Sequence, residues 1–281
     1  MIAFAFERQG VEWQFKHERV RMEPWGPDVI RVRATMNAAF ADMPNALVTA
    51  PETEAHLAET DDGGATLTNG QLTACVSPEG RISFCRTDTR RDLLREVWSK
   101  TDAPSLYPVA REYLATSGNL LQTQVRFEAR PEEHFFGLGQ HRHGLFDQKG
   151  AVIDLFQRNA EVAIPFLVST EGYGFLWNNP AVGRVELAAN QTRWVADATR
   201  QVDYLVVTGD DCAGIMERYA DITGHAPMLP EWAAGFWQKK DWNRLLMFIV
   251  AALLAALPAV GLAITRSKGG IAAAMAALLA G

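Results

Sequence analysis

Alternation of apolar and polar residues with a period of two dominates the first 209 residues and restricts the fold more than any other feature. In residues 28–34 (DVIRVRA), for example, Ile30, Val32 and Ala34 would share one apolar face. Further runs of this kind, separated by glycine and proline, occupy residues 121–127, 163–168, 173–177 and 202–207. Many short strands with almost no helical pattern before residue 210 predict a mainly β protein with an antiparallel β-sandwich over residues 1–209. A β-propeller would need a repeat of about 40 to 50 residues, and none is present.

One hairpin can be predicted to the residue. Residues 71–86 (QLTACVSPEGRISFCR) suit a three-residue loop with Gly80 left-handed, which would pair Ser77 with Arg81. Cys75 and Cys85 then become diagonal neighbours on the face opposite the apolar one, at roughly 7 to 8 Å, beyond the usual Cα span of a disulfide. The three cysteines, Cys75, Cys85 and Cys212, are therefore predicted to be free thiols.

Residues 210–238 predict a connecting helix followed by one strand. Asp210 or Asp211 is suited to the N-cap, apolar residues then recur at three- and four-residue spacing, and Gly224 can end the helix. The apolar, aromatic residues 232–238 are typical of a buried strand.

The remaining residues, 239–281, form an apolar tail. Residues 245–264 are twenty uncharged residues, about the number that a helix needs to cross a bilayer. They predict a transmembrane helix and hence membrane association, although a buried alanine-rich helix is the alternative. Basic residues flank the run almost equally, so its orientation is not predicted. No signal-peptide core precedes Glu7 and Arg8, so a single span at residues 245–264 would be expected to leave the sandwich on the cytoplasmic side.

Charge excludes one class of partner. The net charge is −6 and no block of lysine or arginine occurs, so nucleic acid is not an expected partner.

Two other patterns suggest sites only weakly. Gly137, Gly139 and Gly144 do not have the G-x-G-x-x-G spacing of a nucleotide loop. His141 and His143 could share a strand face, but two histidines without a firm third ligand, His134 and Asp147 being the candidates, do not define a zinc site. No metal or cofactor is expected.

Four motifs in one order carry a family resemblance. They are residues 135–141 (FFGLGQH), 161–179 (EVAIPFLVSTEGYGFLWNN), 219–224 (YADITG) and 227–238 (PMLPEWAAGFWQ). Together they resemble glycoside hydrolase family 31, in particular its bacterial α-xylosidases and α-glucosidases. The resemblance implies that residues 1–209 form a galactose mutarotase-like sandwich and that residues 235–238 begin a (β/α)8 barrel.

The same resemblance implies a retaining glycosidase with two catalytic carboxylates, one of them in a Trp-x-Asp motif on a later barrel strand. None of the eight tryptophans has aspartate two positions later, and about 40 residues after Gln238 cannot make a barrel of roughly 250 residues. We therefore expect the chain to be a family 31 α-glycosidase interrupted before its catalytic residues and inactive alone. A membrane-anchored sugar-binding or scaffolding sandwich is the alternative.

One loop is the candidate binding site. In the family, a sandwich loop reaches over the barrel mouth, and the matching stretch is residues 156–161 (FQRNAE). Phe156 could stack on a sugar, and Arg158 and Asn159 could donate hydrogen bonds to it, which makes an oligosaccharide the candidate partner. The alternative is that Arg158 and Glu161 belong to a solvated turn and that Phe156 is core. No catalytic residue is predicted.

Overall fold

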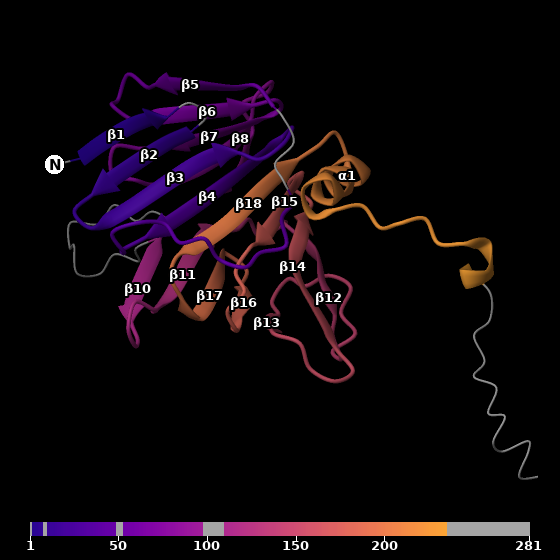
Figure 1. Cartoon of the computed structure of the whole chain (residues 1–281). Coiled ribbons are helices and arrows are strands. Elements are labelled where there is room, and N and C mark those ends of the chain that lie inside the picture. Colours follow the sequence, from indigo (N-terminus) through magenta and orange to yellow (C-terminus); the bar gives the residue numbers. More distant parts are fainter. Residues whose placement is uncertain (1, 8–9, 49–52, 98–109, 235–281) are drawn as a thin grey trace, which may run out of the picture. The chain divides into compact units, whose positions relative to one another are not determined.

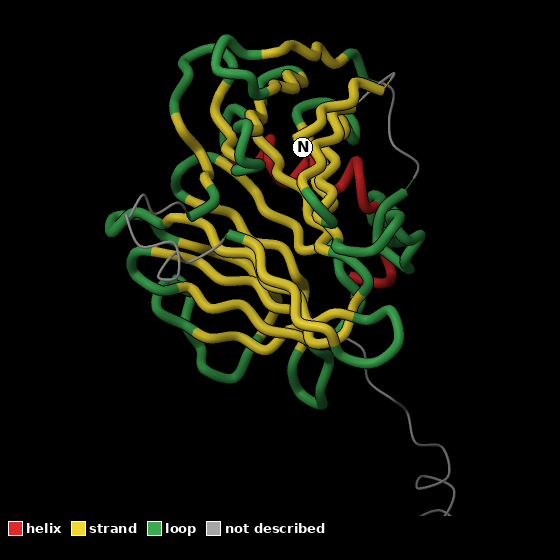
Figure 2. Tube along the Cα trace, turned by 90° about the vertical axis from the view of Figure 1, so that its left-hand side faces the viewer, coloured by secondary structure: helices red, strands yellow, loops and turns green. Residues whose placement is uncertain are grey.

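A computed structural model of the chain describes residues 2–7, 10–48, 53–97 and 110–234. The chain divides into two compact units, Met1–Ala226 and Pro227–Gly281. In the first unit, strands make up most of the trace, and the single labelled helix is α1 (Cys212–Thr223) (Figures 1 and 2). The prediction of a mainly β, antiparallel fold is confirmed.

One layer of the sandwich is an eight-stranded antiparallel sheet, here called the large sheet. Its strands, in spatial order, are β1 (Ile2–Glu7), β2 (Gly10–Phe15), β3 (Glu18–Pro24), β4 (Val29–Thr35), β18 (Val202–Thr208), β15 (Tyr173–Trp177), β14 (Val162–Ser169) and β12 (Phe135–Gln140). Strands from the two ends of the sandwich sequence meet at its centre, where Ala34 of β4 pairs with Val202 of β18.

Two five-stranded sheets face the large sheet. The first contains β5 (Ala55–Glu59), β6 (Ala65–Asn69), β7 (Leu72–Val76), β8 (Ile82–Arg86) and β9 (Asp92–Arg95) in that order. The second contains β10 (Arg111–Ala115), β11 (Leu121–Glu128), β17 (Gln191–Thr199), β16 (Gly183–Leu187) and β13 (Val152–Leu155). A bridge between Glu96 and Phe127 joins them into one layer, reinforced by a 3.0 Å hydrogen bond from the Val97 N–H to the Arg126 carbonyl.

The side chains of β4 lie on the faces of the large sheet that the predicted alternation assigns to them. Ile30, Val32 and Ala34 on β4 lie in the core between the layers, whereas Arg31 points to the other face of the large sheet. There Arg31 forms a bidentate pair with Asp203 of β18, at 3.0 and 2.6 Å. Strand alternation places both charged side chains on a covered face. Because an unpaired buried charge is strongly disfavoured, each of the two groups needs the other as its partner there.

The predicted hairpin is correct in register. Val76 pairs with Ile82, the Ser77 N–H donates to the Arg81 carbonyl at 2.9 Å, and Gly80 has φ +83°. Cys75 and Cys85 lie diagonally on the outer face, opposite Ser83 and Thr73 respectively. All three cysteines are free thiols, as predicted.

Helix α1 follows its predicted signals and covers part of the large sheet. Asp211 is the N-cap and accepts a 2.8 Å hydrogen bond from the Gly214 N–H, while Gly224 ends the helix with φ +101°. Ile215 and Ile222 are buried against the outer face of β15, β18 and their neighbours. Met216 is exposed, because it lies about 100° round the helix from Ile215.

In the second unit, a correction concerns residues 232–238, predicted as a strand. Glu231–Ala234 form a 3₁₀ turn, closed by a 2.8 Å hydrogen bond from the Ala233 N–H to the Pro230 carbonyl. A strand needs a neighbour for its backbone groups, and none of the strands in the described ranges pairs with this segment. Residues 235–238 and the predicted membrane helix, residues 245–264, lie outside the described residues. Among those that are described, no helix has the length and apolar character needed to cross a membrane.

A buried ion cluster joins all three sheets. Arg111 on β10 contacts Glu96, which follows β9, at 2.6 Å, and contacts Glu18 on β3 at 2.7 Å. It also donates to the Gly80 carbonyl at 2.7 Å. Tyr113 donates to Glu18 at 2.9 Å. The Glu96 side chain is fully buried, so the cluster replaces its lost hydration with fixed donors.

Candidate functional site

The predicted site loop, residues 156–161, joins β13 to β14 and forms a tight turn. The Glu161 N–H donates to the Arg158 carbonyl at 3.2 Å, and Ala160 takes a left-handed φ of +66°. Gln157 fixes the base of the turn, because its amide donates to the Ala163 carbonyl at 2.7 Å and accepts from the Ala163 N–H at 3.2 Å. These bonds give the loop a defined shape without a ligand.

Phe156 and Arg158 are brought together within this turn. The Arg158 guanidinium lies 4.2 Å from the centroid of the Phe156 ring, a cation–π contact. It also forms ion pairs with Asp154 at 2.5 Å and Glu161 at 3.4 Å. Phe156 is 37% exposed and is therefore not the core residue of the alternative interpretation. Arg158 and Glu161 do form the turn that this interpretation expected.

Asn159 lies at the tip of the turn and is exposed. Its backbone carbonyl accepts a 3.3 Å hydrogen bond from Arg142, which ties the turn to the loop between β12 and β13. Its carboxamide has no hydrogen-bond partner within the parts of the chain that the structure describes. Of the three predicted residues, Asn159 therefore has the most hydrogen-bonding capacity available.

The neighbouring glycine motif of β12 has a structural explanation. Gly137 and Gly139 have φ of +112° and +95°, and Leu138 between them has φ +66°. A Cβ on Gly139 would lie 2.0 Å from the Val162 carbonyl oxygen. The register of β12 against β14 shifts between the two glycines, so they serve a bulge beside the candidate loop. The geometry thus explains the motif without a nucleotide.

An apolar strip continues from the loop along β14. Val162 and Ile164, on the outer face of the large sheet, are 47% and 42% exposed. Further along the same face Phe166 is buried beneath α1, where its ring stacks on Tyr219 at 4.0 Å. The strip is therefore covered at the α1 end and open at the end next to residues 156–161.

The histidines considered for metal binding contact backbone or aspartate. The ring of His141 lies 2.8 Å from the Leu138 carbonyl oxygen, and His143 Nδ1 accepts from the Leu145 N–H at 3.1 Å. His134 Nδ1 contacts Asp147 at 2.6 Å. Burial tends to raise the pKa of Asp147, but the Lys149 N–H and His134 lower it below its usual value. No group of three metal-ligating side chains occurs in residues 2–7, 10–48, 53–97 and 110–234.

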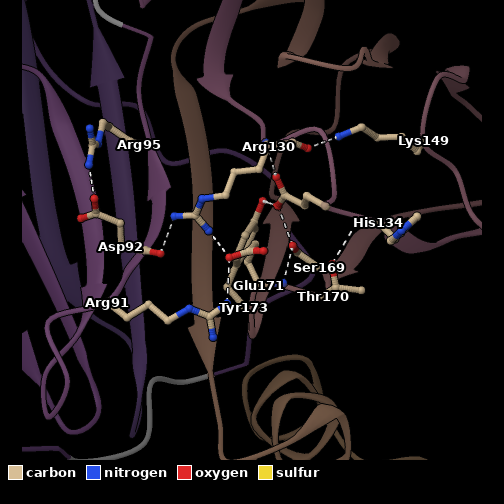
Figure 3. A network of polar contacts seen from close by, with 11 residues as sticks. Arg91, Asp92, Arg95, Arg130, His134, Lys149, Ser169, Thr170, Glu171 and Tyr173 are labelled. Atoms are coloured by element: carbon tan, nitrogen blue, oxygen red, sulfur yellow. Dashed lines mark hydrogen bonds and ion pairs between the residues drawn. The ribbon is translucent and has the colours of Figure 1, made fainter.

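A second polar network lies where the β14–β15 turn meets β9 (Figure 3). The buried Glu133 carboxylate accepts from Ser169 at 2.6 Å and from Tyr173 at 2.8 Å. Glu171 pairs with both Arg91 and Arg130. Burial, then the charge of Glu133, raises the pKa of Tyr173 well above its ordinary value. Every carboxylate drawn has a donor, so this network stabilises the junction of the sheets and does not present reactive groups.

A comparison of the sequence with known families shows to which family the chain belongs. Residues 19–186, most of the sandwich, match the glycosyl hydrolase 31 N-terminal galactose mutarotase-like domain. The chain belongs to glycoside hydrolase family 31. The resemblance inferred from the four motifs is thereby confirmed for the sandwich. The match does not extend to the apolar tail.

Family 31 relatives cover the sandwich and continue beyond it. An uncharacterized family 31 glucosidase of Pseudescherichia vulneris is 35% identical over 244 residues, which are 82% of this chain and 46% of the relative. Alpha-xylosidase A of Aspergillus niger is 29% identical over 259 residues, 84% of this chain and 34% of the relative. A family 31 α-xylosidase from a soil metagenome, solved with xylose, is 37% identical, with a TM-score of 0.79 over 84% of this chain and 36% of its own. This family 31 chain thus spans less than half the length of each.

Two residues of the site were missed by sequence reasoning. Gln157 anchors the turn and Arg142 holds its tip. Gln157 lies within the predicted loop, but its role was not predicted, because a side-chain amide that hydrogen-bonds within its own hairpin produces no recognisable sequence pattern. Arg142 comes from another loop, and only the pairing of β12 with β14 brings it there.

Proposed function

We propose that the sandwich acts as the accessory domain of a family 31 α-glycosidase for α-xylosides or α-glucosides, with residues 156–161 facing the sugar. The observation that carries this proposal is the family match over residues 19–186, joined to the identity with glucosidases and α-xylosidases. The preformed turn supports it, because a loop fixed before binding loses little conformational entropy when a sugar arrives.

Within the loop, we assign different tasks to the three predicted residues. The guanidinium of Arg158 already has two carboxylates and the Phe156 ring, so it stiffens the turn. The exposed carboxamide of Asn159 can both donate to and accept from sugar hydroxyls. The partly exposed Phe156 ring offers an apolar surface of the kind that packs against a pyranose.

Catalysis is not assigned to this chain. Retaining hydrolysis needs one ionised carboxylate to attack the anomeric carbon and one protonated carboxyl to protonate the leaving oxygen. The family's Trp-x-Asp motif is absent from all 281 residues. We expect no turnover of an aryl α-xyloside or α-glucoside by the purified chain. The open apolar strip of Val162 and Ile164 supports contact with a further domain, since exposed apolar surface often marks an interface.

A chimera tests the role of the loop. The sandwich replaces that of the soil-metagenome α-xylosidase, and hydrolysis of an aryl α-xyloside is measured. We expect turnover, and a KM raised about 2- to 13-fold by Asn159→Ala, the equivalent of about 0.5–1.5 kcal/mol for one hydrogen bond. Asn190→Ala, an exposed asparagine in the β16–β17 turn, is the matched control. Equal KM values for the two variants would contradict a sugar contact by Asn159.

Two parts of the proposal need separate measurements. Saturable binding of an oligosaccharide by the intact chain would favour a sugar-binding module that works without a barrel, and it should raise the melting temperature at millimolar sugar. Attachment to a membrane through residues 245–264 remains a prediction. Cell fractionation with and without detergent tests it, and recovery of the chain in the soluble fraction without detergent would argue against it.

A further inference from the structure

Two edge strands, β1 and β5, end the sandwich on the same side. Among the described strands, β1 pairs only with β2 in the large sheet, and β5 pairs only with β6 in the first five-stranded sheet. Because β6 lies across from β2 and β3 in the facing layer, β1 and β5 both lie beyond it at one side of the molecule (Figure 1). Their outward N–H and C=O groups have no strand partner within the described ranges, which makes this side open to further pairing.

The hydrophobic core is less completely covered at this side than one strand further in. Phe4 on β1 pairs with Trp13, which is 2% exposed, and Leu57 on β5 pairs with Leu67, which is fully buried. Phe4 and Leu57 pack against the same core but are themselves only partly buried. Removing this apolar surface from water would favour association. One more strand beside β1 would extend the cover over both side chains.

β1 differs from the other edge strands in lacking features that oppose pairing. At the far edge of the large sheet, β12 contains two glycines with positive φ and a shift of register. β9 and β13 have only four residues each and contain charges, β10 begins with Arg111 and Glu112, and β5 ends in Glu59. Residues 2–6 of β1 (IAFAF) pair with β2 in regular register and include no charge, proline or glycine. Exposed edges are usually protected by such features, so β1 is the edge most suited to bind another strand.

The sequence of β1 is suited to pairing with a second copy of itself. In an antiparallel ladder about a two-fold axis, the register that uses all five uncharged residues places Phe4 opposite Phe4 of the other copy and Ala3 opposite Ala5. Opposed aromatic side chains are favourable cross-strand pairs. Glu7 of each copy then lies just beyond the paired residues, at opposite ends of the ladder, so like charges do not face each other.

We propose that β1 is a self-association surface, through which two copies of the chain join their large sheets into one continuous sheet. Backbone hydrogen bonds between the two β1 strands supply the contact, and further burial of Phe4 and Leu57 contributes apolar area. The candidate sugar loop at residues 156–161 leads into β14, next to the opposite edge strand of the large sheet. Association through β1 therefore leaves this loop open in both copies.

Sedimentation velocity of the full chain over a series of concentrations tests the proposal. A mild detergent is present because residues 245–264 are apolar. We expect a species of twice the chain mass, whose share rises with concentration. Combining Ala3→Lys with Ala5→Lys should raise the dissociation constant roughly 2- to 30-fold, since two pairs of like charges then face each other across the axis. Ala5 is exposed and pairs with Glu12 of β2 within its own chain, so a lysine is tolerated there.

A charge reversal tests the register, and a second edge strand supplies the control. Ala3→Glu combined with Ala5→Lys should return the dissociation constant to that of the unchanged chain or below, because each introduced lysine then faces an introduced glutamate. Leu114→Lys, at a residue of β10 that is 57% exposed, is the matched control and should leave the dissociation constant unchanged. Equal melting temperatures of the variants at low concentration would show that the charges act on association and not on folding.

Three results would overturn the proposal. The first is a chain that stays monomeric at every concentration. The second is association that the double lysine variant does not weaken, which would assign the contact to another surface, residues 235–281 included. The third is a charge-reversed variant that associates no more tightly than the double lysine variant, because the two β1 strands would then not face each other in this register.

Discussion

Arg111 should be among the most costly side chains to replace in the sandwich. Its side chain is 6% exposed and holds the fully buried Glu96 at 2.6 Å, together with Glu18 and a backbone carbonyl. Arg111→Met keeps much of the aliphatic volume but removes the guanidinium. Breaking a buried pair by removing one partner costs about 3–5 kcal/mol, because the other charge is left without compensation. For a domain of this size that loss lowers the melting temperature by roughly 6–20 °C.

The loss should depend on pH in a defined direction. Burial is the largest influence on Glu96 and raises its pKa in the folded protein, while Arg111 lowers it. Without Arg111 the folded pKa rises further, so the folded variant binds more protons than the unfolded chain, in which glutamate titrates near 4.3. The stability of the variant then falls as pH rises from about 4.3, the pKa in the unfolded chain, toward the higher pKa of Glu96 in the folded variant. The deficit of Arg111→Met should therefore be larger at pH 7.5 than at pH 5.

Urea denaturation followed by tryptophan fluorescence at the two pH values measures both effects. Arg193→Met is the matched control, because Arg193 pairs with Glu186 on the surface at 2.5 Å, with both side chains 25–30% exposed. Surface pairs contribute about 0–1 kcal/mol. A deficit below about 1 kcal/mol for Arg111→Met, or an equal deficit at both pH values, would refute the reasoning.

Two further predictions concern single positions. Gly139→Ala should lower the free energy of unfolding by about 2–4 kcal/mol, because Gly139 has positive φ and a Cβ would collide with a carbonyl oxygen of β14. Gly118→Ala is the control and should cost clearly less, since Gly118 also has positive φ (+61°) but open space around it. Equal melting temperatures of the two variants would contradict this. Tyr204→Phe should change stability by less than about 0.5 kcal/mol, since the buried hydroxyl has no partner in the described part of the chain. Tyr173→Phe should lower the free energy of unfolding by about 1–3 kcal/mol, because the Tyr173 hydroxyl donates to a buried carboxylate. A lower melting temperature for Tyr204→Phe than for Tyr173→Phe would show that the hydrogen-bond assignment is wrong.

Local features of the fold were predictable because local chemistry sets them. The loop with left-handed Gly80 fixed the register of one hairpin, and Asp211 capped α1 through its own side chain. Long-range pairing was not predictable in this way. Nothing in the sequence around Arg31 indicates that Asp203 lies diagonally across from it on β18, yet this ion pair explains why a charged residue is tolerated on a covered face.

The candidate site at residues 156–161 stays a prediction, but the structure shows how its side chains lie. A resemblance pointed to residues 156–161, and the structure shows Phe156 and Asn159 exposed there. The role expected of Arg158 changed, because Asp154 and Glu161 on both sides of it compete for the same guanidinium. The strand predicted at residues 232–238 was wrong over residues 232–234, which belong to a 3₁₀ turn, since an apolar pattern cannot show whether a neighbouring strand exists.

The pairing of β4 with β18 at the centre of the large sheet has a consequence for synthesis on the ribosome. Ala34 and Val202 are partners across 168 residues. At about 5–20 residues per second, β4 leaves the ribosome roughly 8–34 s before β18 does. During that time β4 presents an unpaired edge with Ile30 and Val32 uncovered, a state in which strands aggregate. Nascent chains of this protein should therefore depend on chaperones until β18 has emerged.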